Sequence, residues 1–145
     1  TEKHIDGVQS FYGQDGLKEF LARTDILVCL LPLTPETLGI LNTETLSQLP
    51  NGAYVINSGR GLQIVEEDLL AALDSGHIAG AALDVFCMEP LPASSPIWDH
   101  RKIIVTPHIA SLSSPQSAAQ DIAENIRRIR RGETPNDLID MDVGY

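Results

Sequence analysis

Arg60, Glu89 and His108 are the residues of this sequence best suited to acid–base chemistry. The planar guanidinium of an arginine can hold a carboxylate through two parallel hydrogen bonds. A histidine titrates near neutral pH and can donate a proton, and a neighbouring carboxylate favours its charged form. Such a set suits the reduction of a 2-oxo acid: the arginine orients the substrate and polarises its ketone, the histidine protonates the oxygen, and the glutamate tunes the histidine.

Each of these residues also has an ordinary structural explanation. Arg60 lies between two glycines, as many surface-loop residues do, Glu89 precedes a proline as in many solvated turns, and His108 follows a proline in a loop. The catalytic interpretation is favoured because all three follow separate predicted strands. That placement brings them to the edge of a sheet where ligands bind.

Four short apolar segments predict the strands that position these residues. They cover residues 26–31, 53–57, 78–85 and 103–105. The first is apolar without alternation, which indicates a parallel strand covered by helices on both faces. Helical periodicity and capping signals predict helices over residues 15–23, from an Asn42 cap to residue 49, and over 66–75, where Gly76 ends the helix.

Strands that alternate with helices at these lengths predict an α/β fold with an open, doubly wound parallel sheet. In such sheets ligands bind at the carboxyl ends of the strands. Polar residues follow all four predicted strands directly, in residues 32–34, in 58–61, from Asp84 onward and in 106–108. We therefore expect these four segments to lie together at one edge of the sheet.

The C-terminal part has a different pattern. Ser114 and Pro115 are a helix cap and a first-turn residue, and they precede a long amphipathic helix that ends near Gly132. Its apolar stripe consists of Ala118, Ala119, Ile122, Ile126 and Ile129. We interpret residues 1–110 as part of a nucleotide-binding domain and residues 111–145 as a helix and tail that belong to a substrate domain.

Composition limits the classes of function. The 145 residues carry a formal net charge of −10, which argues against a nucleic-acid partner. The basic cluster of residues 127–131 fits a solvated helix end, where cations offset the helix dipole. The longest apolar run is too short to cross a bilayer, and Cys29 and Cys87 form no CxxC pair. We expect a soluble, cytoplasmic protein without a membrane partner.

Three sequence blocks resemble the signature blocks of the D-isomer-specific 2-hydroxyacid dehydrogenases, in the same order and at similar spacing. They are Asn57-Ser58-Gly59-Arg60-Gly61, residues 83–92 (LDVFCMEPLP) and Thr106-Pro107-His108-Ile109-Ala110. Residues 30–37 (LLPLTPET) resemble the family loop that passes the cofactor. The resemblance covers essentially the whole chain. Within the family, residues 7–11 and 69–76 are similar to members that reduce glyoxylate and hydroxypyruvate.

The resemblance implies an NAD(P)-dependent oxidoreductase with a 2-oxo or 2-hydroxy acid as its small-molecule substrate, no metal, and a homodimeric assembly. It implies NADP as the cofactor, with NAD as the alternative, and Lys3 also favours NADP. Asp84 would lie near the nicotinamide amide or, alternatively, would cap amides at its strand end. By resemblance the catalytic residues are Arg60, Glu89 and His108, and the cofactor-binding residues are Leu31, Pro32, Thr37, Ser58, Gly59, Arg60 and Asp84.

The sequence contains no GxGxxG phosphate loop, and we expect it to begin just past the second strand of the dinucleotide fold. We therefore expect the 145-residue chain to be inactive by itself. Two alternatives stay open for the complete protein. One is a D-2-hydroxyacid dehydrogenase of the phosphoglycerate or lactate type that uses NAD. The other is a binding protein that senses dinucleotides.

Overall fold

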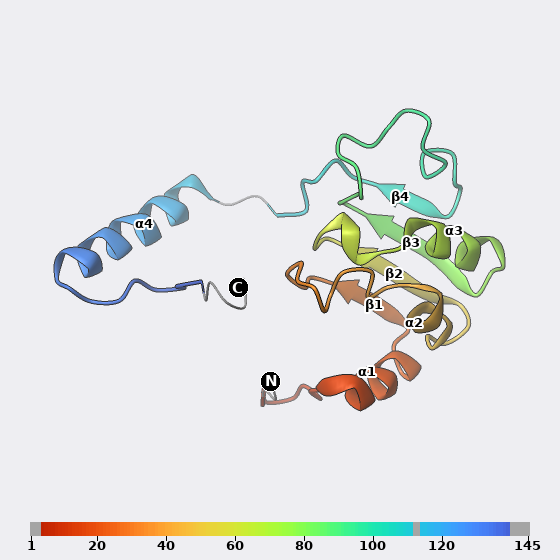
Figure 1. Cartoon of the computed structure of the whole chain (residues 1–145), viewed down its shortest axis with the longest axis horizontal. Coiled ribbons are helices and arrows are strands. Elements are labelled where there is room, and N and C mark those ends of the chain that lie inside the picture. Colours follow the sequence, from red (N-terminus) through yellow and green to blue (C-terminus); the bar gives the residue numbers. More distant parts are fainter. Residues whose placement is uncertain (1–3, 112–113, 140–145) are drawn as a thin grey trace. The chain divides into compact units, whose positions relative to one another are not determined.

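The predicted parallel sheet is present in the computed structural model, which describes residues 4–111 and 114–139. The sheet contains β1 (Ile26–Cys29), β2 (Ala53–Asn57), β3 (Ile78–Leu83) and β4 (Ile103–Val105), in the order β1-β2-β3-β4 with every pair parallel (Figure 1). The predicted second and fourth strands are confirmed to the residue. The first and third end two residues earlier than predicted, so Leu30, Leu31, Asp84 and Val85 leave the sheet.

The chain forms two compact units, Thr1–His108 and Ile109–Tyr145. The first unit contains the sheet together with α1 (Gly13–Ala22), α2 (Thr43–Ser47) and α3 (Glu66–Asp74). Asn42 caps α2 as predicted, because its side chain accepts hydrogen bonds from the first-turn amides of that helix. Gly76 follows α3 with a φ of 82°, the left-handed conformation that a helix-ending glycine provides.

Within the described residues, helices cover one face of the sheet. Leu27, Val55 and Leu83 lie on the covered face and are at most 5 % exposed, and they form one core with side chains of α1, α2 and α3. Side chains on the opposite face alternate with them and are exposed, for example Val28 at 49 % and Ile104 at 67 %. The predicted α/β parallel sheet is confirmed with helices on the covered face, and helices on the opposite face stay a prediction. An apolar strand pattern shows that a face avoids water without showing which segment covers it.

The long segment between β3 and β4 has no regular structure, and its own side chains hold it to the core. Ile97 is 2 % exposed and Phe86 is 7 % exposed, and both belong to the core cluster. The indole N–H of Trp98 donates a hydrogen bond to the carbonyl of Pro92 at 2.9 Å. These anchors give the segment that carries Glu89 a fixed path.

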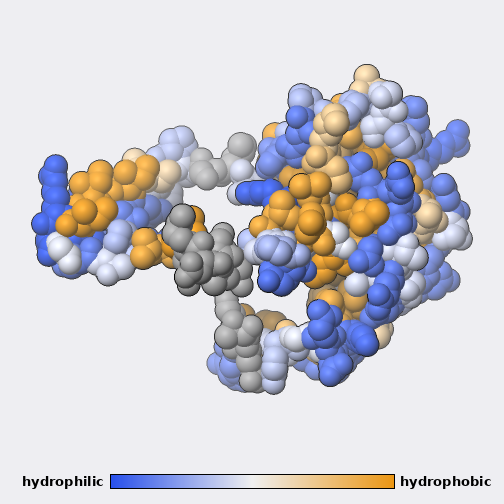
Figure 2. All heavy atoms as spheres, viewed as in Figure 1, coloured by the Kyte–Doolittle hydropathy of each residue, from blue (hydrophilic) through white to orange (hydrophobic). Residues whose placement is uncertain are grey.

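The second unit contains α4 (Pro115–Arg130), whose N-cap Ser114 accepts a hydrogen bond from the amide of Ser117 as the sequence predicts. No residue of α4 is buried, and its stripe of apolar side chains is exposed, with Ile122 at 61 % and Ile129 at 60 % (Figure 2). The side chains of Arg127 and Arg131 in the basic cluster at its end are 63 % and 51 % exposed and pair with Glu124 and Glu133, so the prediction of a solvated helix end is confirmed for these two residues. None of the helices among residues 4–111 and 114–139 combines the length and the hydropathy that a membrane span needs.

Leu73 provides a test of the core. Its side chain has 0 % exposure where α3 packs on the sheet. We expect Leu73→Ala to lower the free energy of unfolding by about 2–5 kcal/mol, because truncation leaves a cavity. Chemical denaturation of the full-length protein measures this change. Leu38→Ala, at a position that is 58 % exposed, is the control and should have a much smaller effect. Equal losses in the two variants would contradict the packing described.

Candidate functional site

The carboxyl ends of the four strands lie at one edge of the sheet. Cys29 pairs with Asn57, Asn57 with Leu83, and Leu83 with Val105, so the strands end in register. The segments that follow them therefore leave the sheet side by side, as the sequence predicts (Figure 1). All the predicted catalytic and cofactor-binding residues are carried by these four segments.

Glu89 and His108 are in direct contact. Nδ1 of His108 lies 2.8 Å from Oε2 of Glu89, and the backbone N–H of Phe86 donates to the other carboxylate oxygen at 3.0 Å. His108 has a φ of 53°, which is uncommon outside glycine, and its backbone N–H donates to the carbonyl of Asp84 at 2.8 Å. The imidazole is thus fixed at both backbone and side chain, while 51 % of its side chain stays exposed.

A cavity of about 700 Å³ lies beside this pair. Apart from Glu89 and His108, its lining is apolar and consists of Phe86, Pro90, Leu91, Trp98, Val105 and Pro107. Apolar walls exclude water and strengthen the interaction between titratable groups and a charged ligand. An acid–base pair against an apolar wall is an arrangement suited to proton transfer.

Arg60 is exposed in the loop that follows β2, and the buried side chain of Asn57 shapes this loop. Asn57 accepts a hydrogen bond from the N–H of Gly59 at 3.0 Å and donates one to the carbonyl of Arg60 at 3.1 Å. The Arg60 guanidinium donates to the carbonyl of Gly59 at 2.8 Å. Arg60 is not among the residues that line the cavity. The structure thus places it at the predicted edge without bringing it into the cavity with Glu89 and His108.

Close packing explains the two glycines beside Arg60. A Cβ atom at Gly61 would lie 1.9 Å from the carbonyl carbon of Phe86, and one at Gly59 would lie 2.3 Å from Oε1 of Gln63. Both distances are far below van der Waals contact. The loop of Arg60 therefore packs directly on the backbone that leads to Glu89. Side chains at these two positions would force the loops apart.

The other predicted cofactor residues line the same edge. The hydroxyl of Thr37 donates to the carbonyl of Pro32 at 2.7 Å and so closes the loop after β1. Leu31, in that loop, is 43 % exposed. The amide of Ser58 donates to the carbonyl of Cys29 at 3.2 Å, which links the loops after β1 and β2.

Asp84 is only 4 % exposed, and its Oδ1 accepts a hydrogen bond from the hydroxyl of Thr106 at 2.5 Å. Its backbone N–H donates to the carbonyl of Asn57, and its own carbonyl accepts from His108. Asp84 therefore joins the segment after β3 to the segments on both sides. The side chain accepts from a hydroxyl here, and both the capping of nearby amides and a contact with a cofactor stay predictions.

Gln63 is a site residue that the sequence interpretation missed. It ends the short 3₁₀ helix η1 (Gly61–Gln63) with 0 % exposure and bonds to both the loop after β1 and the loop of Arg60. The sequence signal for its burial was its position as the one polar residue in the apolar run Leu62-Gln63-Ile64-Val65. A polar residue in an apolar run is usually buried with partners.

Three side chains near the site have shifted pKa values. The hydrogen bond from His108, with a smaller contribution from the Phe86 amide, lowers the pKa of Glu89 below its ordinary value of 4.5. Burial, assisted by the carboxylate of Glu66, raises the pKa of the Cys87 thiol to about 11. Burial also raises the pKa of Cys29. Both cysteines are free thiols, and these shifts disfavour the reactive thiolate.

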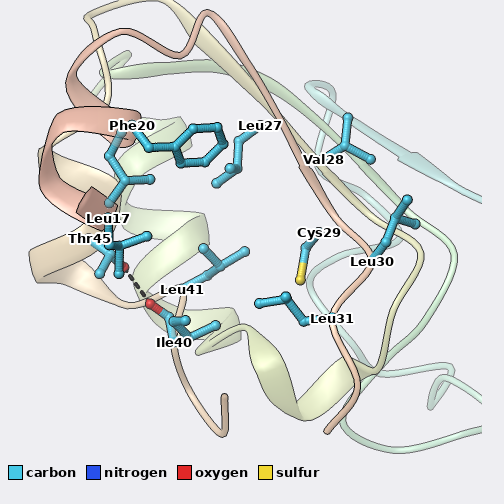
Figure 3. Close-up of a pocket in the computed structure, with 11 residues that line it drawn as sticks. Leu17, Phe20, Leu27, Val28, Cys29, Leu30, Leu31, Ile40, Leu41 and Thr45 are labelled. Atoms are coloured by element: carbon cyan, nitrogen blue, oxygen red, sulfur yellow. Dashed lines mark hydrogen bonds between the residues drawn. The ribbon is translucent and has the colours of Figure 1, made fainter. Parts of the chain in front are cut away.

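A second hollow of about 340 Å³ lies between α1, β1 and the segment before α2 (Figure 3). Its lining is almost entirely apolar, and Leu17, Phe20 and Leu31 are among the side chains that face it. The hydroxyl of Thr45 already donates to the carbonyl of Ile40 at 2.7 Å. This hollow offers no converging titratable groups, so the cavity beside His108 is the stronger candidate site.

Lys3, which favoured NADP, lies outside the described residues. Among the residues that the structure describes, no cluster of three or more His, Cys, Asp or Glu side chains could hold a metal ion.

A family model, a curated relative and solved structures all relate this chain to the same protein family. Residues 2–110 match the family model described as "D-isomer specific 2-hydroxyacid dehydrogenase, NAD binding domain". The chain is 50 % identical to a glyoxylate/hydroxypyruvate reductase A from Photorhabdus laumondii over 145 residues, which is 100 % of this chain and 46 % of that protein. The chain thus spans about half the length of this curated relative.

Solved structures agree in fold. A D-isomer specific 2-hydroxyacid dehydrogenase from Xanthobacter autotrophicus Py2, in complex with NADPH and MES, matches with a TM-score of 0.93 and 51 % identity, over 97 % of this chain and 58 % of that one. An NADPH-dependent glyoxylate/hydroxypyruvate reductase from Sinorhizobium meliloti, in complex with NADP and sulfate, matches with a TM-score of 0.93 and 41 % identity. That match covers 100 % of this chain and 47 % of that one.

Because Gly61 packs against the backbone of Phe86, a methyl group added at Gly61 should lower the stability of the fold substantially. Gly61→Ala should lower the free energy of unfolding by about 1–3 kcal/mol or more, because backbone rather than a flexible side chain occupies the space. Thermal unfolding of the full-length protein measures it. Gly16→Ala in α1, where a Cβ would lie 3.4 Å from its nearest neighbour, is the matched control and should be neutral or slightly stabilising. An unchanged melting temperature for Gly61→Ala would show that the loops do not pack this closely.

The lowered pKa of Glu89 predicts how stability depends on pH. The folded state binds a proton on this carboxyl less readily than the unfolded state, so ionised Glu89 contributes stability above its ordinary pKa of 4.5. That contribution is lost as the pH falls through the lowered folded-state value. Glu89→Gln should therefore lower the melting temperature at pH 7, and the difference from the parent protein should shrink below pH 4.5. A difference that stays constant with pH would contradict the assignment.

Proposed function

The chain belongs to the D-isomer specific 2-hydroxyacid dehydrogenase family, and from that membership we propose that the full-length protein reduces glyoxylate or hydroxypyruvate to the corresponding 2-hydroxy acid with NADPH. The named relative and the NADPH-dependent neighbour support this choice of substrate and cofactor over an NAD-dependent enzyme of the phosphoglycerate or lactate type. The product from hydroxypyruvate would have the D configuration.

The contact between Glu89 and His108 is the observation that carries the proposal. His108 donates a proton to the ketone oxygen of the substrate, and Glu89 holds the imidazole through Nδ1 at 2.8 Å. That bond leaves Nε2 as the nitrogen that faces the substrate. The apolar wall of the cavity reduces the contact of water with the oxygen that receives the proton.

Arg60 binds the substrate carboxylate and polarises the ketone. Its guanidinium is exposed at the same sheet edge and must turn from the Gly59 carbonyl toward the substrate. A long exposed arginine side chain can make this movement by rotation of its own bonds. The fixed backbone of the loop sets the point from which the side chain reaches.

The chemistry of the residues at this edge fits a dinucleotide. Exposed Leu30 and Leu31 offer an apolar surface for a flat ring. By the family resemblance, Ser58 and Asp84 would lie next to the nicotinamide part of the cofactor. NADPH, when bound, supplies the hydride. Leu31, Pro32, Thr37, Ser58, Gly59, Arg60 and Asp84 are the residues that would hold it.

The division of the chain into domains, the assembly and the location are part of the same proposal. Residues 1–110 serve the nucleotide-binding domain, and residues 111–145 belong to the substrate domain. The exposed isoleucines of α4 support this assignment, because an apolar stripe needs a surface that covers it. We propose a homodimer, as the family resemblance implies, and a cytoplasmic location, as the composition and the unpaired cysteines favour.

Replacement of His108 tests the proposed function. In the full-length protein, His108→Gln should lower kcat for glyoxylate reduction by at least about 100-fold, because general acid catalysis is lost. The dissociation constant of NADPH, measured by fluorescence titration, should be unchanged. Steady-state oxidation of NADPH with glyoxylate, hydroxypyruvate, phosphohydroxypyruvate and pyruvate identifies the preferred substrate.

His100→Gln is the matched control. His100 also lies next to a carboxylate, with Nε2 3.3 Å from Asp74, but it precedes β4 and does not line the cavity. Its replacement should leave kcat unchanged. Full activity of His108→Gln would exclude the proton-donor role. A protein that binds NADPH, reduces none of the four acids and changes its oligomeric state on binding would be a dinucleotide sensor instead.

A further inference from the structure

Gln63 is buried at the point where two loops of the candidate site meet. Its side-chain amide has two donor hydrogens and an acceptor oxygen with two lone pairs. Nε2 donates to the carbonyls of Leu31 at 2.7 Å and Pro32 at 3.1 Å. Oε1 accepts from the backbone N–H of Arg60 at 2.8 Å and from the thiol of Cys29 at 3.3 Å. All four bonding positions of the amide are therefore used.

These bonds join segments that are distant in sequence. Leu31 and Pro32 belong to the loop after β1, and Arg60 belongs to the loop after β2, some thirty positions later. The direction of the amide is determined by its partners, because two of them are carbonyls that only accept and one is a backbone N–H that only donates. A glutamine side chain matches this combination.

The amide is closely packed against the backbone of the Arg60 loop. Oε1 lies 2.3 Å from the position that a Cβ of residue 59 would occupy, so a side chain at Gly59 would displace the amide. On the other side of the loop, Gly61 contacts the backbone of Phe86. The η1 turn that carries Gln63 is thus held between two backbones, and its side chain sets the spacing between the loops after β1 and β2.

We propose that Gln63 is a positioning residue that couples the cofactor loop, Leu31 and Pro32, to the backbone of the substrate-binding Arg60. The inference rests on the proposed function for what the two loops bind. Gln63 touches neither ligand. It acts by holding two backbones at the separation that lets a dinucleotide and a 2-oxo acid bind next to each other.

The test is Gln63→Met in the full-length protein, a replacement of similar length that removes all four bonds. We expect the NADPH dissociation constant and the KM for the 2-oxo acid each to rise about tenfold, because both loops lose their shared partner. The fall in kcat should be smaller, since Glu89 and His108 are untouched. Hydrogen exchange of the Arg60 amide should become faster.

Gln63→Glu distinguishes the effect on the loop after β1 from the effect on the loop of Arg60. It also provides a second test if Gln63→Met folds poorly. It keeps an oxygen that accepts from Arg60 but points a second oxygen at the carbonyls of Leu31 and Pro32. The NADPH dissociation constant should therefore rise more than the KM, and the Arg60 amide should stay protected. Leu73→Ala is the stability control, since it weakens the core without touching either loop and should leave both constants unchanged.

The possible results distinguish this inference from the proposed function. Unchanged binding constants in both Gln63 variants, or an equal rise in Leu73→Ala, would overturn the positioning role. If the parent protein binds NADPH but reduces no 2-oxo acid, the proposed function fails while the NADPH constants still decide the role of Gln63. If the parent protein binds no dinucleotide, hydrogen exchange of the Arg60 amide in Gln63→Met is the deciding measurement. An unchanged exchange rate would overturn the positioning role of Gln63, and a faster rate would support it.

Discussion

The in-register ending of four parallel strands is the constraint on which the site depends. Cys29, Asn57, Leu83 and Val105 are consecutive partners across the sheet, so the chain leaves it four times at the same edge. A shift of one residue in any strand would turn its side chains to the other face and change where the following loop begins. The apolar core beneath the sheet therefore fixes the starting points of all four segments that carry the candidate site residues.

From those points, polar bonds between neighbouring segments complete the arrangement. Asn57 and Gln63 shape the loop of Arg60, Asp84 connects to Thr106 and His108, and Glu89 bonds to His108. These bonds run sideways along the edge rather than down into the core. Each loop is therefore held by the next, and the geometry of the site is a property of the whole edge.

The sequence predicted the parts of this arrangement that repeat with a simple period or form a contiguous block. Strands over 53–57 and 103–105, the Asn42 and Ser114 caps and the pairing of Glu89 with His108 are confirmed. Gln63 was missed because three of its four bonding partners, Cys29, Leu31 and Pro32, lie more than thirty residues away in sequence. The open face of the sheet was not predicted either, because an apolar strand does not encode which segment covers it.

The backbone of His108 adopts a conformation that stability alone would assign to a glycine. A φ of 53° costs a non-glycine residue about 1–2 kcal/mol, whereas glycine adopts it freely. A glycine would relax the loop and remove the only imidazole beside the cavity in the described part of the chain. Selection for thermal stability alone would therefore favour replacement of His108 by glycine. The strained conformation marks a place where folding free energy is given up to aim a side chain.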